Sequence, residues 1–187
     1  MMELKQYLRV IYKRLWLIIL LPFVSAATAA YVSFYIIEPV YEARTSLYVI
    51  NRTIDPKYTV SYTELMAGQM LVKDYRELIK SRAVTQVVID DLQMHDLTPQ
   101  DLAGKISVNA KNDTRFIEIS VLDSYPERAK DLANKTSQVF VKKAVSLMKV
   151  ENVEIIDYAQ KPVMPVKPRP YVNTVVALLA GIMGAIG

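Results

Sequence analysis

An uncharged apolar run from Leu15 to Ile37 dominates the hydrophobic pattern of the chain, with Lys13-Arg14 before it and Glu38 after it. As an α-helix the run would extend roughly 34 Å, against about 30 Å for the hydrocarbon core of a bilayer. The pattern therefore predicts a first transmembrane helix over residues 15–37.

A cleaved signal peptide is the alternative interpretation of the same run. Basic residues, the apolar stretch Leu15–Val24 and the small residues Ser25-Ala26-Ala27 follow one another as they do in signal sequences. The apolar run continues to Ile37, which is longer than a signal sequence needs, and this length favours a retained span.

The segment before the run, residues 1–14, is basic. It contains Lys5, Arg9, Lys13 and Arg14 against a single acid, Glu3. By the positive-inside rule this segment stays in the cytoplasm. The residues that follow the first span are therefore expected outside the cytoplasmic membrane.

Residues 38–160 carry the patterns of one extracytoplasmic α+β domain. Alternating apolar and polar positions predict strands over residues 41–50, 106–110, 115–122 and 153–158. Apolar positions three or four apart, together with capping signals, predict helices over 61–80, 82–92 and 124–148 and a short turn from Thr98. Ser81 is the expected cap of the second helix, and Leu147 the last core position of the third.

The predicted order of elements is β-α-α-β-β-α-β. It corresponds to the ferredoxin-like, split βαβ arrangement, with a four-stranded sheet and its helices on one face.

A proline-rich spacer is predicted over residues 161–171, with Pro162, Pro165, Pro168 and Pro170. The three-residue spacing of the first three prolines matches the turn of polyproline II and predicts an extended, stiff rod. The alternative is a PxxP ligand for an SH3-type domain. The expected place of the segment, outside the cytoplasm and next to the membrane, favours the spacer.

Residues 172–187 are again uncharged and predict the start of a second transmembrane helix, which the sequence is expected to cut short. Small residues recur at four-residue spacing on two adjacent stripes, and such spacing permits close packing of helices. They are Ala177, Gly181 and Ala185 on one stripe and Ala180 and Gly184 on the other.

Composition narrows the possible chemistry. The 187 residues include no cysteine, which excludes disulfides, thiolate zinc sites and a cysteine nucleophile. The net charge of +4 is mild, and outside residues 1–14 the basic residues are mostly interleaved with acids, so no nucleic-acid surface is predicted. His95 is the only histidine and cannot form a zinc site alone. We therefore expect no catalytic residue, no cofactor, no metal site and no enzymatic activity.

Several short segments, taken in order, resemble a known family. They are Pro39-Val40-Tyr41-Glu42-Ala43 leading into Leu47-Tyr48-Val49, Tyr75-Arg76-Glu77-Leu78-Ile79-Lys80-Ser81, Asp123 with Pro126, Ala129, Ala133 and Asn134, the three spaced prolines, and Gly181 with Gly184. The chain resembles the polysaccharide co-polymerase (chain-length determinant, Wzz-like) family. It is most similar to the short capsular and exopolysaccharide members that partner a separate tyrosine kinase.

The resemblance implies a multi-pass protein of the cytoplasmic membrane that forms ring-like homo-oligomers and has no enzymatic activity. Such proteins set the length, or permit the export, of a capsule, exopolysaccharide or O-antigen made by a Wzy-type polymerase, and they modulate a cytoplasmic tyrosine kinase. The polysaccharide itself is a further candidate partner. Tyr75, Arg76 and Glu77 are the candidate oligomer contact.

Two alternative classes of function would each require a feature of their own. A membrane-anchored, extracytoplasmic ligand-sensing domain would need a concave pocket with convergent polar groups. A membrane-bound hydrolase would need a nucleophile and a base in contact, and the sequence presents no such pair.

Overall fold

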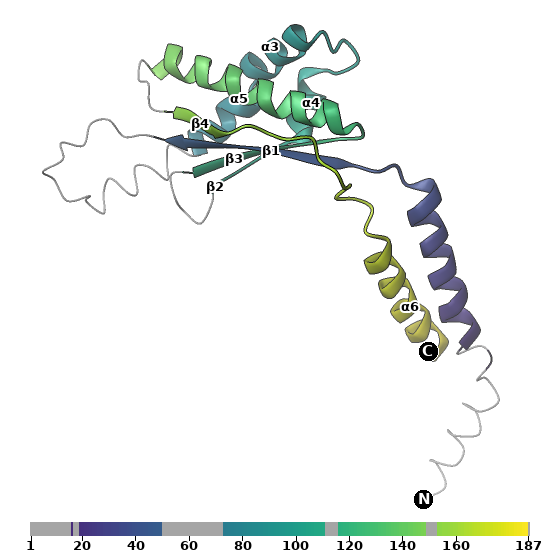
Figure 1. Cartoon of the computed structure of the whole chain (residues 1–187). Coiled ribbons are helices and arrows are strands. Elements are labelled where there is room, and N and C mark those ends of the chain that lie inside the picture. Colours follow the sequence, from purple (N-terminus) through teal and green to yellow (C-terminus); the bar gives the residue numbers. More distant parts are fainter. Residues whose placement is uncertain (1–15, 17–18, 50–72, 111–115, 149–152, 187) are drawn as a thin grey trace, which may run out of the picture. The chain divides into compact units, whose positions relative to one another are not determined.

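Two apolar helices from opposite ends of the sequence belong to the first of the two units into which the chain divides (Figure 1). Unit 1 comprises Met1–Pro39 and Val166–Gly187, and unit 2 comprises Val40–Pro165. The structure is a computed structural model that describes residue 16 and residues 19–49, 73–110, 116–148 and 153–186.

The first helix of unit 1 is described from residue 19 and widens into a π-helix, η1, at Val32–Ile36. Its partner in the unit is α6, Pro170–Ile186. Proline suits the first position of a helix because its missing N–H would have no partner there. The helix therefore starts slightly before the predicted residue 172.

Unit 2 contains the predicted four-stranded sheet, which is confirmed. Its strand order is β2-β3-β1-β4, and every neighbouring pair is antiparallel. Strands β2 and β3, which are consecutive in the chain, pair with each other, and Val108 lies opposite Ile119. The strands are β1 (Tyr41–Val49), β2 (Ile106–Ala110), β3 (Phe116–Asp123) and β4 (Val153–Asp157).

The helices of unit 2 lie on one face of this sheet (Figure 1). They are residues 73–80, α3 (Arg82–Leu92), α4 (Pro99–Lys105) and α5 (Pro126–Met148). Thr98 and Asp101 form a capping box, and α4 is a seven-residue helix, longer than the short turn predicted. Ser81 is the N-cap residue of α3, but its side chain does not cap the helix; its hydroxyl donates to the Leu78 carbonyl at 2.7 Å.

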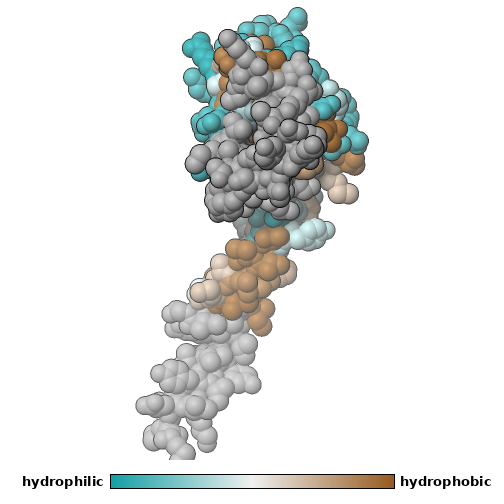
Figure 2. Space-filling model, turned by 90° about the vertical axis from the view of Figure 1, so that its left-hand side faces the viewer, coloured by the Kyte–Doolittle hydropathy of each residue, from teal (hydrophilic) through white to brown (hydrophobic). Residues whose placement is uncertain are grey.

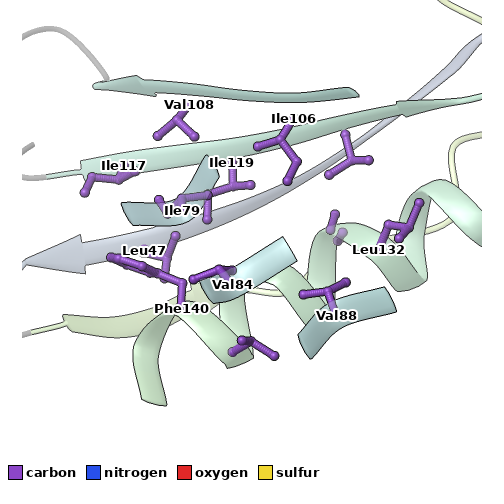
Figure 3. Packing of buried hydrophobic residues seen from close by; sticks show 14 of the residues in the cluster. Leu47, Ile79, Val84, Val88, Ile106, Val108, Ile117, Ile119, Leu132 and Phe140 are labelled. Carbon is purple, nitrogen blue, oxygen red and sulfur yellow. The ribbon is translucent and has the colours of Figure 1, made fainter. Parts of the chain in front are cut away.

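The core lies between the helices and the sheet. Alternate strand residues such as Leu47 and Ile119 meet helix residues such as Val84 and Phe140, all fully buried (Figure 3). On α5 the predicted core face holds as far as Ala144. The assignment of Leu147 to the core is wrong, because 63% of it is exposed. Helical periodicity shows which face is apolar but not where its packing partner ends.

Some predicted segments fall wholly or partly outside the described residues. These are the greater part of the 61–80 helix, the turn between β2 and β3, and residue 50 at the end of the first strand. Where the 61–80 helix is described, it has Tyr75 and Ile79 on its buried side, as its apolar stripe predicts.

Candidate functional site

The surface of unit 1 is apolar, as the hydropathy colouring of its described residues shows (Figure 2). Among the described residues, one helix is long and apolar enough to cross a membrane, Ile19–Ile36. Only 17% of that stretch is buried, so it is not the core helix of a soluble domain. The helix α6 is apolar but shorter.

The two helices of unit 1 approach most closely at Gly181, which is buried. A Cβ atom added to Gly181 would lie 2.5 Å from Ser25 Oγ and 2.6 Å from Pro22 Cα. By contrast, a Cβ at Gly184 would lie 3.6 Å from the nearest atom of Leu21, an ordinary contact. Close approach at this crossing therefore requires glycine at position 181.

Two polar contacts join the helices on one side of this crossing. Ser25 Oγ lies 2.9 Å from the Ala177 carbonyl oxygen, to which it can donate. Toward the other end of the pair, Asn173 Nδ2 donates to Ser33 Oγ at 3.0 Å. Ser33 is 4% exposed and lies within η1.

The structure separates the two predicted small-residue stripes. Ala177, Gly181 and Ala185 are buried or half-buried, whereas Ala180 and Gly184 are exposed. The first stripe therefore faces the partner helix within unit 1. The polar contacts of Ser25, Ser33 and Asn173 were not singled out from the sequence.

The predicted polyproline rod is not straight. The backbone bends at residues 163, 164 and 166, and Pro170 belongs to α6 rather than to the spacer. Polyproline II has no internal hydrogen bonds, so proline spacing alone does not hold a chain straight. Pro162, Pro165 and Pro168 do belong to the irregular segment between β4 and α6.

The segment that leaves the sheet after β4 is fastened to α5. The side-chain amide of Asn134 donates to the Ala159 carbonyl at 3.0 Å and accepts from the Ala159 N–H at 2.7 Å. Lys161 forms an ion pair with Glu127 at 3.0 Å. These contacts hold the start of the proline-rich segment against the domain.

A buried carboxylate, Asp123, joins the end of β3 to the beginning of α5. Its side chain is 1% exposed and accepts from Lys105 Nζ at 2.7 Å, Arg128 Nε at 3.0 Å and the Tyr125 N–H at 3.0 Å. Burial alone would raise the pKa of Asp123, but these three donors outweigh it and hold the pKa below its ordinary value. Asp123 therefore stays ionised and fixes the strand–helix corner.

The candidate oligomer contact does not lie on one surface. Tyr75 is fully buried, with its ring 5.4 Å from that of Phe140. Arg76 is exposed, yet its Nε donates to the Val108 carbonyl of edge strand β2 at 3.0 Å. Glu77 is exposed. Tyr75 is therefore a core residue, and only Arg76 and Glu77 are available for a contact.

A helix long and apolar enough to cross a membrane, packed against a shorter apolar helix and joined to an α/β domain, is typical of a membrane-anchored protein, and comparison with known proteins gives the family. Residues 1–92 match the Wzz family, described as "Chain length determinant protein". Residues 130–187 match the GNVR family, described as "G-rich domain on putative tyrosine kinase". The chain belongs to the Wzz chain length determinant family.

Its relatives in that family are named for capsule biosynthesis. The chain is 36% identical over 182 residues to "Capsular polysaccharide biosynthesis protein CpsC" of Streptococcus pneumoniae, covering 97% of this chain and 79% of the relative. It is 32% identical over 187 residues to "Probable capsular polysaccharide biosynthesis protein YwqC" of Bacillus subtilis, covering 99% of this chain and 75% of the relative. It is 27% identical over 185 residues to "Capsular polysaccharide type 5 biosynthesis protein cap5A" of Staphylococcus aureus, covering 99% and 82%.

Proposed function

We propose that this protein is a non-enzymatic regulator of the chain length and export of a surface polysaccharide, in a capsule-type system. The observation that carries the proposal is the match to CpsC over 97% of the chain, together with the chain length determinant family over residues 1–92. The alternative, a ligand-sensing domain, is not favoured by these relatives.

The proposed topology has two membrane spans and an extracytoplasmic domain between them. The packing of α6 against the Ile19–Ile36 helix supports α6 as the second span, because an apolar helix fixed alongside a membrane helix would share its environment. The basic residues before the first span support a cytoplasmic N-terminus. The strand order of unit 2 supports the ferredoxin-like arrangement.

The proposed partners are further copies of the chain, a cytoplasmic tyrosine kinase, a Wzy-type polymerase and the polysaccharide. The match of residues 130–187 to a domain described by its occurrence on tyrosine kinases supports the kinase. The proposals that the chain forms homo-oligomers and that it partners a Wzy-type polymerase rest on the family resemblance alone. Arg76 and Glu77 are the proposed subunit contact, with exposure as their support.

Gene deletion followed by gel analysis of the surface polysaccharide tests this function. The expected result is a loss of the modal chain length, or loss of export, with repeat-unit synthesis intact. A plasmid copy of the gene should restore it. An unchanged length distribution in the deletion strain would contradict the proposal.

Reversal of both charges, in the Arg76→Glu/Glu77→Arg variant, tests the subunit contact separately. The mass of the detergent-solubilised protein should fall if these residues join subunits. The control variant Asp90→Arg changes an exposed charge on α3 instead. An unchanged mass in the double variant would count against this contact.

A further inference from the structure

The face of the sheet opposite the helices carries a cluster of polar side chains. Strand residues alternate between the two faces of the sheet. The residues that face the core are odd-numbered, from Ala43 to Val49 on β1 and from Ile117 to Val121 on β3. The even-numbered residues therefore point away from the helices seen in Figure 1. On β2 the buried core residues are the even-numbered Ile106 and Val108, so there the odd-numbered residues lie on the outer face. The sheet-face patch is defined as Glu42, Arg44, Ser107, Asn109, Glu118 and Ser120.

Strand register brings these side chains together from three strands. Ser120 of β3 lies between Arg44 on β1 and Ser107 on β2. In the next row, Glu118 lies opposite Asn109. Residues paired directly across strands have Cβ atoms about 5 Å apart, so the six side chains form one continuous surface.

The charged groups of the patch are held in place by one another. Arg44 Nη2 donates to Glu42 Oε2 at 2.9 Å, and its Nη1 lies 3.7 Å from Glu118 Oε1. The hydrogen bond and charge of Glu42 raise the pKa of Arg44. The guanidinium and two carboxylates therefore present fixed donors and acceptors, of which each carboxylate retains free acceptor capacity.

One hydroxyl in the centre of the patch makes no hydrogen bond to another described residue. Ser120 is 4% exposed, and its hydroxyl makes no hydrogen bond within the part of the chain that the structure describes. The buried Ser33 and Ser137, by contrast, both have hydrogen-bond partners. Thr136 Oγ1 is the buried side-chain oxygen without a partner among the described residues, so the Ser120 hydroxyl oxygen is itself open to solvent and can bind water or a ligand.

An aromatic pair adjoins the patch on the same face. The rings of Tyr48 and Phe116, which lie opposite each other on β1 and β3, are 4.9 Å apart, and Phe116 is 40% exposed. Aromatic rings provide a flat apolar surface, and the neighbouring amide, hydroxyl and carboxylate groups provide hydrogen bonds. Sugar rings present this same combination of an apolar C–H face and a rim of hydroxyls.

We infer that the sheet-face patch binds uncharged sugar units of a polysaccharide, an inference that rests on the proposed function. The two carboxylates outnumber the single guanidinium, so the patch repels acidic sugars and favours neutral ones. A second copy of the chain fits less well, because the centre of a stable protein interface is apolar and depleted of charge, and the centre of this patch is neither.

Binding of the cell's own polysaccharide to the full chain in phosphatidylcholine nanodiscs tests the inference. The probes are oligosaccharides from the surface polysaccharide of the producing cells, used as isolated and after chemical reduction of their carboxylates to alcohols. We expect the reduced, neutral probe to bind at least as tightly as the acidic one. No binding of either probe, or binding that requires the carboxylates, would overturn the inference.

The Asn109→Ala/Glu118→Ala variant should weaken binding by about tenfold or more, because it removes a neutral and a charged hydrogen-bonding group. The control variant Gln86→Ala/Asp90→Ala removes a matching amide and carboxylate, 2.9 Å apart on α3, and should bind normally. Equal affinity of the two double variants would overturn the inference. Ser120→Ala, which changes one atom, serves as a second probe if the patch variant unfolds in a thermal scan.

Two further measurements separate this inference from its alternatives. A loss of oligomer mass in the patch variant, with unchanged glycan binding, would make the patch a subunit interface and overturn the inference. If the wild-type protein binds no probe but gene deletion still alters polysaccharide length, only the inference fails. If deletion leaves the length unchanged, the proposed function fails.

Discussion

Replacing Gly181 by alanine perturbs the helix pair of unit 1 at its closest contact. The new Cβ would lie 2.6 Å from Pro22 Cα, and ordinary Cβ contacts begin at about 3.4 Å. Pro22 Cα belongs to the backbone and cannot rotate away, as the Ser25 hydroxyl can. The helices must therefore separate by about 0.8 Å at this point, which is the difference between those two distances.

The separation has a cost that can be estimated. A shift of that size would lengthen the 2.9 Å contact between Ser25 Oγ and the Ala177 carbonyl beyond hydrogen-bonding distance. Interhelical hydrogen bonds in membranes contribute about 0.6 kcal/mol on average, and overpacking costs about 1–3 kcal/mol. A loss of about 2 kcal/mol would weaken helix pairing by roughly 30-fold.

Disulfide cross-linking measures this pairing, since the chain has no native cysteine. Cysteines replacing Ser33 and Asn173, whose side chains are in contact at 3.0 Å, should form a disulfide in isolated membranes under mild oxidation. The disulfide should form more slowly when Gly181→Ala is added, and Gly181→Leu should abolish it.

Gly184→Ala is the matched control, because its Cβ would make only an ordinary 3.6 Å contact with Leu21. It should cross-link at the same rate as the parent with glycine at both positions. Equal rates for Gly181→Ala and Gly184→Ala would refute the packing argument, since the two glycines would then be equivalent.

Three further changes test unit 2. Thr136→Val should raise the unfolding temperature by stabilising the fold by about 1 kcal/mol, because the buried Thr136 hydroxyl has no partner among the described residues; a lower temperature would contradict this. Asp123→Asn should destabilise the domain by about 3 kcal/mol in chemical denaturation, since it leaves two cations facing a neutral amide. The folded pKa of Asp123 is lowered, so its contribution is complete above the unfolded value of about 3.9 and is lost as pH falls through the folded value. As the pH drops below about 4, the free energy of unfolding of the wild type should therefore decrease by an amount that the variant does not lose. Parallel pH profiles of the two proteins would refute that role. Asn134→Ala should speed chymotrypsin cleavage after Tyr158 by freeing Ala159, with unchanged cleavage as the opposing result.

Local patterns predicted the secondary structure of unit 2 closely. The helix expected over 82–92 is α3 with those bounds, and the strand expected from Tyr41 is β1. Both elements are periodic along their whole length, so the signal is contained within the segment. Leu147 shows the limit: it continues the apolar stripe of α5 past the last residue that the core covers.

Contacts between distant segments were not predictable in the same way. Asp123 has partners at Lys105 and Arg128, and Asn134 meets Ala159 only after the chain has passed through β4. The two predicted small-residue stripes were likewise equivalent in sequence. Which of them faces the other helix depends on the rotation of the helices, which spacing does not specify.

Every proposed role depends on the proposed placement of unit 2 outside the cytoplasm, which can be tested directly. The native chain lacks cysteine, so a Gln138→Cys variant carries one thiol, on an exposed position of α5. A membrane-impermeant maleimide should label it in intact cells, and a Lys5→Cys variant should be labelled only after lysis. Labelling of Gln138→Cys only after lysis would place the domain in the cytoplasm and contradict the account.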